Sequence, residues 1–224
     1  MIDIAQKTEK LIVNETFLSI QGESTHVGRL CFFIRLAGCN LSCEYCDTNY
    51  ACGEGDGQRS SIDHLVNQAN MSDVRLVEIT GGEPLLQHGT PKLCRQLLAN
   101  GFEVLVETNG SLPICNLPPA VKKIVDCKTP SSNMESSNLY DNYFLLSPHD
   151  EVKFVLSDRN DYEFACDIID KYSLWKKTPN LLFSAVWGKL SLRSLAGWMA
   201  ADKVKARLQL QIHKVIWPPD QRGV

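Results

Sequence analysis

Short apolar runs alternate along this chain with segments whose apolar residues recur at helical spacing, and this alternation restricts the fold more than any other feature. The runs are rich in β-branched and aromatic residues and have the length of buried strands. They predict strands at residues 30–36, 75–80, 102–108, 122–127, 151–156 and 181–185. The intervening segments predict helices at residues 61–68, 93–99, 161–172 and 190–201.

The order of these elements indicates a fold class. Strands that alternate with helices form a parallel sheet through right-handed crossovers. A further run at residues 207–213 alternates Leu208, Leu210 and Ile212 with polar neighbours and predicts one more strand. Six or seven strands fall short of the closed eight-stranded barrel, which takes about 250 residues. We therefore expect one α/β domain over residues 1–224, an incomplete (β/α) barrel of six or seven mostly parallel strands, open on one side.

Charge and hydropathy argue against several classes of protein. The net charge of −3 does not favour an extended nucleic-acid-binding surface. No apolar run has the length of a membrane span, and the N-terminal residues MIDIAQKTEK lack the apolar core of a secretory signal. We expect a cytoplasmic protein with no nucleic-acid partner and no membrane partner. In that compartment the nine cysteines of the chain do not indicate a disulfide framework.

Three cysteines, Cys39, Cys43 and Cys46, lie close together in the stretch AGCNLSCEYCDTNY. A structural zinc site takes four ligands, so a zinc site here would have to borrow a remote ligand such as Cys52. The alternative is an iron–sulfur cluster that leaves one iron without a protein ligand and open to a small molecule. Most of the remaining cysteines are expected to be small core residues: Cys31, Cys94, Cys115, Cys127 and Cys166.

Polar motifs follow four of the predicted strands at their carboxyl ends. The cysteine triplet follows the first strand, TGGEP (80–84) the second, ETNG (107–110) the third and DCKTP (126–130) the fourth. Ligands of parallel α/β folds bind beyond these strand ends, so the four motifs should share one rim. Two further segments are expected to be loops. Residues 53–57 form a glycine-rich turn without the sequence of a phosphate-binding loop, and the serine-rich residues 131–142 form a mobile surface loop or lid.

The spacing Cys-x-x-x-Cys-x-x-Cys after the first barrel strand, together with ITGGEP (79–84) at the end of the next strand, resembles the radical S-adenosylmethionine (SAM) superfamily. The resemblance implies that Cys39, Cys43 and Cys46 ligate a [4Fe–4S] cluster that activates SAM. It also implies that the glycine pair lets the backbone approach the methionine end of SAM, and that Glu83 holds the SAM amino group.

Four longer stretches are similar to the 7-carboxy-7-deazaguanine synthase family: FLSIQGES (17–24), FIRLAGCNLSCEYCDT (33–48), VLVETNG (104–110) and LQLQIHK (208–214). The similarity extends from about residue 14 to the C-terminus. It implies conversion of 6-carboxy-5,6,7,8-tetrahydropterin to 7-carboxy-7-deazaguanine, with loss of ammonia, in queuosine or 7-deazapurine biosynthesis. A 5′-deoxyadenosyl radical would take hydrogen from C6 before the ring contracts. The family further implies Mg²⁺, a homodimer and a flavodoxin- or ferredoxin-type electron donor.

The same resemblance assigns site residues by position, within an N-terminal segment (14–24), a cluster loop (37–50) and the strand ends. Thr48 would offer its hydroxyl to Mg²⁺, and the Arg35 guanidinium suits a substrate carboxylate. The residues along SAM would be Tyr45, Cys46, Asp47, Gly82, Glu83, Asp126, Cys127, Lys128, Ser184, Ala185, Val186 and Trp187. Those along the substrate would be Ile20, Gln21, Gly22, Arg35, Thr80, Glu107, His213 and Pro219. Some relatives have Ser-Pro-Lys in place of Asp126-Cys127-Lys128 and Gln-Pro in place of Ser184-Ala185.

Two alternative functions share part of these features. An activase of glycyl-radical enzymes has the same cysteine spacing and would act on a protein chain, but it gives no role to Arg35 or Thr48. A non-enzymatic zinc-binding module would explain the cysteines alone.

Overall fold

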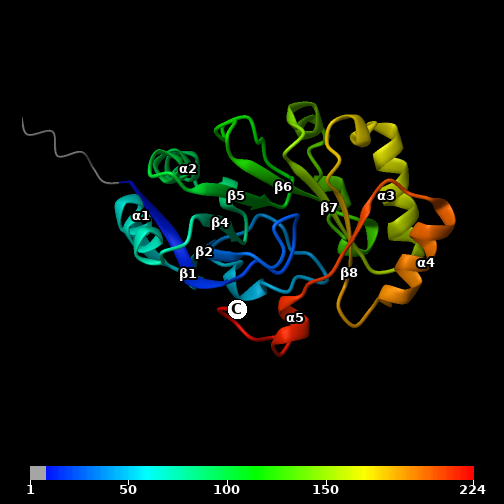
Figure 1. Cartoon of the computed structure of the whole chain (residues 1–224), viewed down its shortest axis with the longest axis horizontal. Coiled ribbons are helices and arrows are strands. Elements are labelled where there is room, and N and C mark those ends of the chain that lie inside the picture. Colours follow the sequence, from blue (N-terminus) through cyan, green and yellow to red (C-terminus); the bar gives the residue numbers. More distant parts are fainter. Residues whose placement is uncertain (1–8) are drawn as a thin grey trace, which may run out of the picture.

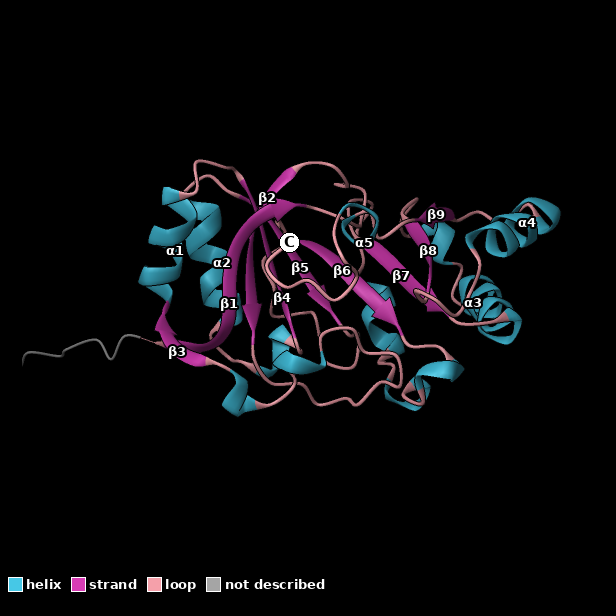
Figure 2. Cartoon of the chain, turned by 90° about the horizontal axis from the view of Figure 1, so that it is seen from below, coloured by secondary structure: helices cyan, strands magenta, loops and turns pink. Residues whose placement is uncertain are grey.

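The computed structural model describes residues 9–224 and contains a nine-stranded sheet with the order β3-β1-β2-β4-β5-β6-β7-β8-β9 (Figures 1 and 2). The strands are β1 (Lys10–Ile20), β2 (Leu30–Leu36), β3 (Gln58–Ser61), β4 (Leu76–Gly81), β5 (Glu103–Thr108), β6 (Lys122–Cys127), β7 (Glu151–Leu156), β8 (Leu181–Ala185) and β9 (Arg207–Gln209). From β2 through β4 to β9 all neighbours are parallel, and the sheet does not close on itself. The predicted incomplete barrel is confirmed.

Two strands were not expected from the sequence. β1 pairs antiparallel with β2 and with β3, so it extends the parallel sheet at one edge. A polar stretch, Asn14-Glu15-Thr16, interrupts the apolar pattern of β1 at its centre, where the register with β2 also shifts. β3 is a polar edge strand of four residues, QRSS, and carries no hydrophobic signal at all.

The helices are α1 (Ile62–Met71), α2 (Thr90–Ala99), α3 (Arg159–Lys171), α4 (Leu192–Asp202) and α5 (His213–Ile216). Figure 2 shows α1 and α2 at the end of the sheet near β1 and β3, and α3 and α4 at the other end. Side chains fix where two of them begin, because the Ser61 hydroxyl accepts the amide of His64 and the Asp158 carboxylate accepts that of Asp161. None of the helices within residues 9–224 is both long enough and apolar enough to cross a bilayer.

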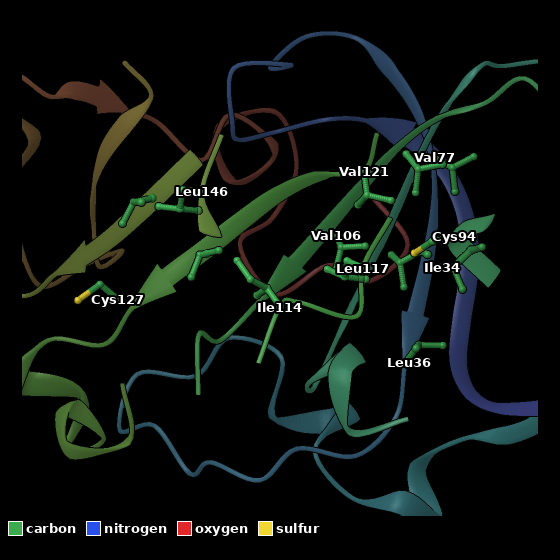
Figure 3. Close-up of a cluster of buried hydrophobic side chains, with 14 of the residues drawn as sticks. Ile34, Leu36, Val77, Cys94, Val106, Ile114, Leu117, Val121, Cys127 and Leu146 are labelled. Atoms are coloured by element: carbon green, nitrogen blue, oxygen red, sulfur yellow. The ribbon is translucent and has the colours of Figure 1, made fainter. Parts of the chain in front are cut away.

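Successive side chains of a strand face opposite sides of the sheet, and here the two sides differ in character. One set packs with the helices in the main hydrophobic core, which includes Ile34, Val77, Val106 and Cys127 (Figure 3). The opposite set contains a small apolar cluster of Cys31, Phe33, Leu76, Leu105 and Ile124. Polar residues follow this cluster towards the carboxyl ends of the same strands, so a polar layer covers an apolar one on the inner side of the barrel.

The cysteines outside the cluster loop behave largely as predicted. Cys31, Cys94 and Cys127 are buried core residues, and Cys166 is half-buried against the core. Cys115 differs, because it lies exposed in the loop after β5.

One prediction for the second half of the chain was wrong, and another segment has more regular structure than expected. The predicted strand at residues 207–213 ends at Gln209, so His213 begins the short helix α5. Residues 131–142, expected as a mobile surface loop, are folded into 3₁₀ turns, and Asn142 among them is buried. The Asn142 side chain accepts a hydrogen bond from Ile114 N at 3.1 Å and donates to Leu112 O at 2.9 Å. These bonds tie the segment to the loop after β5 and replace the hydration that a polar loop would need.

Candidate active site

A cavity of about 580 Å³ opens at the carboxyl ends of the parallel strands. Side chains from β1, β2 and β4 to β7 line it, together with the cluster loop and the C-terminal segment around α5. The four motifs that were expected on one rim all contribute to its wall: the cysteine triplet, Thr80 to Gly82, Glu107 to Asn109, and Asp126 with Lys128.

The cluster loop is fixed at its start, its middle and its end. Gly38 and Cys39 donate backbone hydrogen bonds to Ala51 O (2.8 Å) and Cys52 O (2.9 Å), which close the loop at its base. In its middle, the Tyr45 hydroxyl donates to Val155 O on β7 at 3.1 Å. Because its base and its middle are held in this way, the loop presents Cys39, Cys43 and Cys46 to the cavity.

The three cysteines have the donor set of an iron–sulfur cluster with one open iron. Two N–H groups point at the sulfur of Cys39, Leu41 N at 3.5 Å and Asn109 Nδ2 at 3.8 Å, as suits a thiolate ligand. Within residues 9–224, no three His, Cys, Asp or Glu side chains are arranged to hold a single metal ion. This holds for the cysteine triplet as well, so the assignment to a cluster rests on the spacing of the three thiols and on their place in the cavity wall.

Cys52 lies beside this triplet and lines the same cavity. Burial, reinforced by the neighbouring Cys46 and Cys39, raises the pKa of Cys52 to about 12. Its Sγ donates to Thr48 O at 3.7 Å.

The glycine pair at the end of β4 packs against the end of β2 and the start of the cluster loop. A Cβ at Gly81 would lie 2.0 Å from Leu36 O, and one at Gly82 would lie 2.2 Å from Gly38 O. Gly81 also has a φ of 141°, which side-chain-bearing residues rarely adopt. The close approach leaves the backbone of Gly82 on the cavity wall, as a surface along which a ligand can lie. This cradle fits the predicted approach to SAM.

Glu83 is not brought to the cavity wall. It is fully buried, and its Oε1 accepts from Leu85 N at 2.9 Å and from Thr108 Oγ1 at 2.8 Å. Its Oε2 accepts from Asn109 N at 2.6 Å. These bonds join the ends of β4 and β5, which gives Glu83 a positioning role in this structure.

The other residues predicted along SAM divide into two groups. Tyr45, Asp47, Asp126, Lys128, Val186 and Trp187 line the cavity, and the Lys128 Nζ lies 2.7 Å from Asp126 Oδ2. Cys127, Ser184 and Ala185 do not line it. The Cys127 side chain alternates with those of its neighbours and points into the hydrophobic core (Figure 3).

All eight residues predicted along the substrate line the cavity, including Ile20, Thr80, Glu107 and Pro219. Gly22 and His213, which are far apart in the sequence, pack against each other. A Cβ at Gly22 would lie 2.1 Å from His213 Nδ1, and Ile212 N donates to Gly22 O at 3.0 Å. The glycine therefore lets α5 close on the N-terminal segment.

Arg35 forms a partly buried ion pair at one side of the cavity. Its Nε donates to Glu15 Oε1 at 2.9 Å, and its side chain is only 13% exposed. The Tyr50 hydroxyl donates to the same carboxylate oxygen at 3.2 Å, and the guanidinium lies 5.8 Å from the ring centroids of Tyr50 and Phe17. The bond to Glu15 uses Nε alone, so the two terminal nitrogens remain for an anionic ligand.

Several residues that line the cavity were given no individual role from the sequence, among them Glu78 and Lys153, whereas Glu23 falls within the predicted N-terminal segment 14–24. The Lys153 Nζ lies 3.2 Å from Glu23 Oε2 and also forms an ion pair with Glu107. Burial lowers the pKa of Lys153, but the surrounding carboxylates outweigh burial and raise it well above its usual value. The signal in the sequence was a charged residue at an inward-facing position of an apolar strand, in VEIT for Glu78 and in EVKFVL for Lys153.

Comparison with known proteins agrees with this geometry. A model of the radical SAM superfamily matches residues 33–173. The 7-carboxy-7-deazaguanine synthase of Koribacter versatilis is 40% identical over 95% of this chain and 99% of its own length. The enzyme of the same name from Chlorobaculum tepidum is 42% identical over 96% of this chain and 97% of its own length. The crystal structure of QueE from Escherichia coli shares the fold, with a TM-score of 0.75 over 90% of this chain and 93% of that one at 22% identity.

Proposed function

Because this chain belongs to the radical SAM superfamily and, within it, to the 7-carboxy-7-deazaguanine synthase family, we propose that it converts 6-carboxy-5,6,7,8-tetrahydropterin to 7-carboxy-7-deazaguanine with release of ammonia. One observation in the structure supports this proposal independently of the family membership. The cysteine triplet, the glycine cradle and a partly buried arginine all face one cavity, which is large enough for a bicyclic substrate beside a nucleoside cofactor.

Membership of the superfamily implies a [4Fe–4S] cluster and SAM. Cys39, Cys43 and Cys46 would hold the cluster, and the backbone at Gly82 would lie along SAM. When bound, the two cofactors supply the one-electron chemistry that produces a carbon radical able to abstract hydrogen. The chain itself supplies position and shelter from water, because the cluster loop is tied to β7 and α5 closes on the N-terminal segment.

On the substrate side, the terminal nitrogens of Arg35 would bind the carboxylate of the pterin. Glu107, which is paired with Lys153, would accept hydrogen bonds from ring N–H groups. The Thr80 hydroxyl donates to Glu107 Oε2 at 3.3 Å and would hold that carboxylate in place.

Thr48 is the proposed Mg²⁺ ligand. It stands at the N-cap of the 3₁₀ turn Asn49–Ala51, yet its side chain makes no capping hydrogen bond. The Thr48 hydroxyl therefore does not cap the turn, which is the usual structural role of a threonine at this position. Replacing Thr48 with alanine should raise the Mg²⁺ concentration needed for turnover without changing cluster content, since Mg²⁺ keeps most of its ligands from water and substrate. Superimposable Mg²⁺ titrations of the two proteins would remove Thr48 from the metal site.

We also propose a homodimer and a flavodoxin- or ferredoxin-type electron donor, both on the strength of the family resemblance. The glycyl-radical activase alternative would need access for a protein chain to the same cavity.

Anaerobic turnover with 6-carboxytetrahydropterin, SAM, Mg²⁺ and a reduced flavodoxin tests the proposed function. We expect 7-carboxy-7-deazaguanine and ammonia in equal amounts from the cluster-loaded protein, and none from Cys43→Ala. Formation of 5′-deoxyadenosine without any ring-contracted product would contradict the proposed substrate and favour another radical SAM activity.

A further inference from the structure

Glu78 is a buried carboxyl group of the cavity that has no cationic partner of its own. It lies on β4 with 3% of its surface exposed, and it lines the cavity. The two cations whose charges act on it are engaged elsewhere, Arg35 with Glu15 and Lys153 with Glu107. Within residues 9–224 no lysine or arginine forms an ion pair with Glu78.

Gln21 holds this carboxyl group from one side. The Oε1 of Gln21 accepts a hydrogen bond from Glu23 N at 2.8 Å, so its Nε2 is turned towards Glu78 and donates to Oε2. The Gln21 backbone is fixed as well, because it donates to Arg29 O and accepts from Gly28 N, both at 2.8 Å. The second carboxyl oxygen of Glu78 has no protein hydrogen bond within the described residues, and it belongs to a side chain on the cavity wall.

The surroundings of Glu78 favour its neutral form. Burial raises its pKa well above the usual value for glutamate, and the charges of Glu107 and Glu23 act in the same direction, whereas Lys153 and Arg35 oppose them. An ionised carboxylate at this depth with one hydrogen bond would be a poorly compensated buried charge. The neutral acid has an O–H group that can donate to a ligand.

We propose that Glu78 is a substrate-recognition residue that donates a hydrogen bond, as a neutral acid, to the ring carbonyl or ring nitrogen of a 2-aminopyrimidinone, and that Gln21 positions it. This inference rests on the proposed function, because the pterin substrate carries that ring. The ring presents donors and acceptors side by side on one edge. Glu107 on the adjacent strand offers an acceptor and Glu78 offers a donor, so the two carboxyl groups together complement that edge.

Three variants test the proposal: Glu78→Gln, Glu78→Leu and, as a control, Glu103→Gln. Glu103 is a partly exposed acid on the neighbouring strand, it pairs with Arg29, and it lies outside the cavity. Binding of 6-carboxytetrahydropterin to the cluster-loaded, SAM-bound protein is measured by anaerobic equilibrium dialysis without reductant. The amide of Glu78→Gln can still donate to the ring and accept from Gln21, so its Kd should stay within about threefold of wild type. Glu78→Leu should weaken binding about tenfold or more, with SAM binding unchanged, and Glu103→Gln should bind normally.

Equal weakening in Glu78→Gln and Glu78→Leu would mean that Glu78 acts as an ionised acceptor, which overturns the proposed donor. No weakening in either would mean that Glu78 does not touch the substrate. If Glu78→Leu fails to fold, difference infrared spectroscopy tests instead whether Glu78 is protonated and whether it contacts the pterin. A protonated-carboxyl band should be present in wild type, absent in Glu78→Gln, and shifted when the pterin is added. A missing band, or a band that the pterin does not shift, overturns the proposal. If wild type binds the pterin without converting it, the proposed function fails and the recognition role of Glu78 is still decided.

Discussion

Cys52 lies beside the cysteine triplet, yet we expect the cluster not to need it. It stands outside the Cys-x-x-x-Cys-x-x-Cys spacing, and its Sγ is turned to the backbone, where it donates to Thr48 O at 3.7 Å. Cys43→Ala should abolish the brown cluster absorbance and all turnover, while Cys52→Ala should keep wild-type iron and labile sulfide after anaerobic purification. Loss of the cluster in Cys52→Ala would show that the chain supplies four ligands and would remove the open iron.

Arg35 serves two anions, Glu15 through Nε and, in our proposal, the substrate carboxylate through its terminal nitrogens. A lysine has one ammonium and cannot reproduce that fork. Arg35→Lys should raise the KM for the pterin by an amount equivalent to about 1–3 kcal/mol, while SAM affinity stays unchanged. Arg29→Lys is the matched control, because Arg29 pairs with Glu103 outside the cavity. A KM unchanged in Arg35→Lys would reduce Arg35 to a partner of Glu15.

Among the structural elements, the contact between the end of β4 and the cluster loop leaves no room for a side chain. A methyl group at Gly82 would collide with backbone at Gly38 O, and backbone cannot rotate away as a side chain can. Gly82→Ala should therefore displace the loop, lower cluster content and weaken SAM binding, with a stability loss of about 1–3 kcal/mol. Gly55→Ala is the control within the same region, because its Cβ would meet nothing within 4 Å. Equal SAM affinity in the two variants would show that the loop adapts.

The elements also show how far sequence reasoning reaches. β6, β7 and β8 were predicted to the residue, because buried parallel strands are continuous apolar runs between turn signals. β1 was missed because the polar stretch Asn14-Glu15-Thr16 interrupts its apolar pattern. β3 was missed because this edge strand of four polar residues has no hydrophobic signal. Cysteine spacing and the TGGEP motif identified one side of the cavity. The charged network around Lys153 was not predicted, because the hydrogen-bond partners of Lys153, Glu23 and Glu107, are 130 and 46 residues away in the chain.

At the scale of the whole molecule, the inner side of the barrel is an apolar layer covered by charged groups. Cys31, Leu76, Leu105 and Ile124 make the lower layer. Glu78, Glu107 and Asp126 stand above it on β4, β5 and β6, and Lys153 joins them from β7. Burial of so many acids opposes folding unless each one is paired or neutral. Asp126 is paired, and the Lys128 and Lys153 charges outweigh its burial and lower its pKa. Glu78 has no cationic partner among the described residues, so we expect it to be protonated and neutral in the folded protein.

This arrangement predicts how stability depends on pH. Glu78 has a folded-state pKa well above its unfolded value of 4.5, so the folded protein holds one more proton than the unfolded chain between those two values. The contribution of Glu78 to stability is fully present below pH 4.5 and is lost as pH rises towards the folded pKa. The glutamine side chain of Glu78→Gln does not titrate, so its contribution to stability does not depend on pH. The stability of Glu78→Gln relative to wild type should therefore grow from pH 5 to pH 8, by up to about 1.4 kcal/mol per pH unit. The measurement is the difference in Tm between the two cluster-loaded proteins at a fixed scan rate. A difference that stays constant over this range would mean that Glu78 is already ionised in the folded protein.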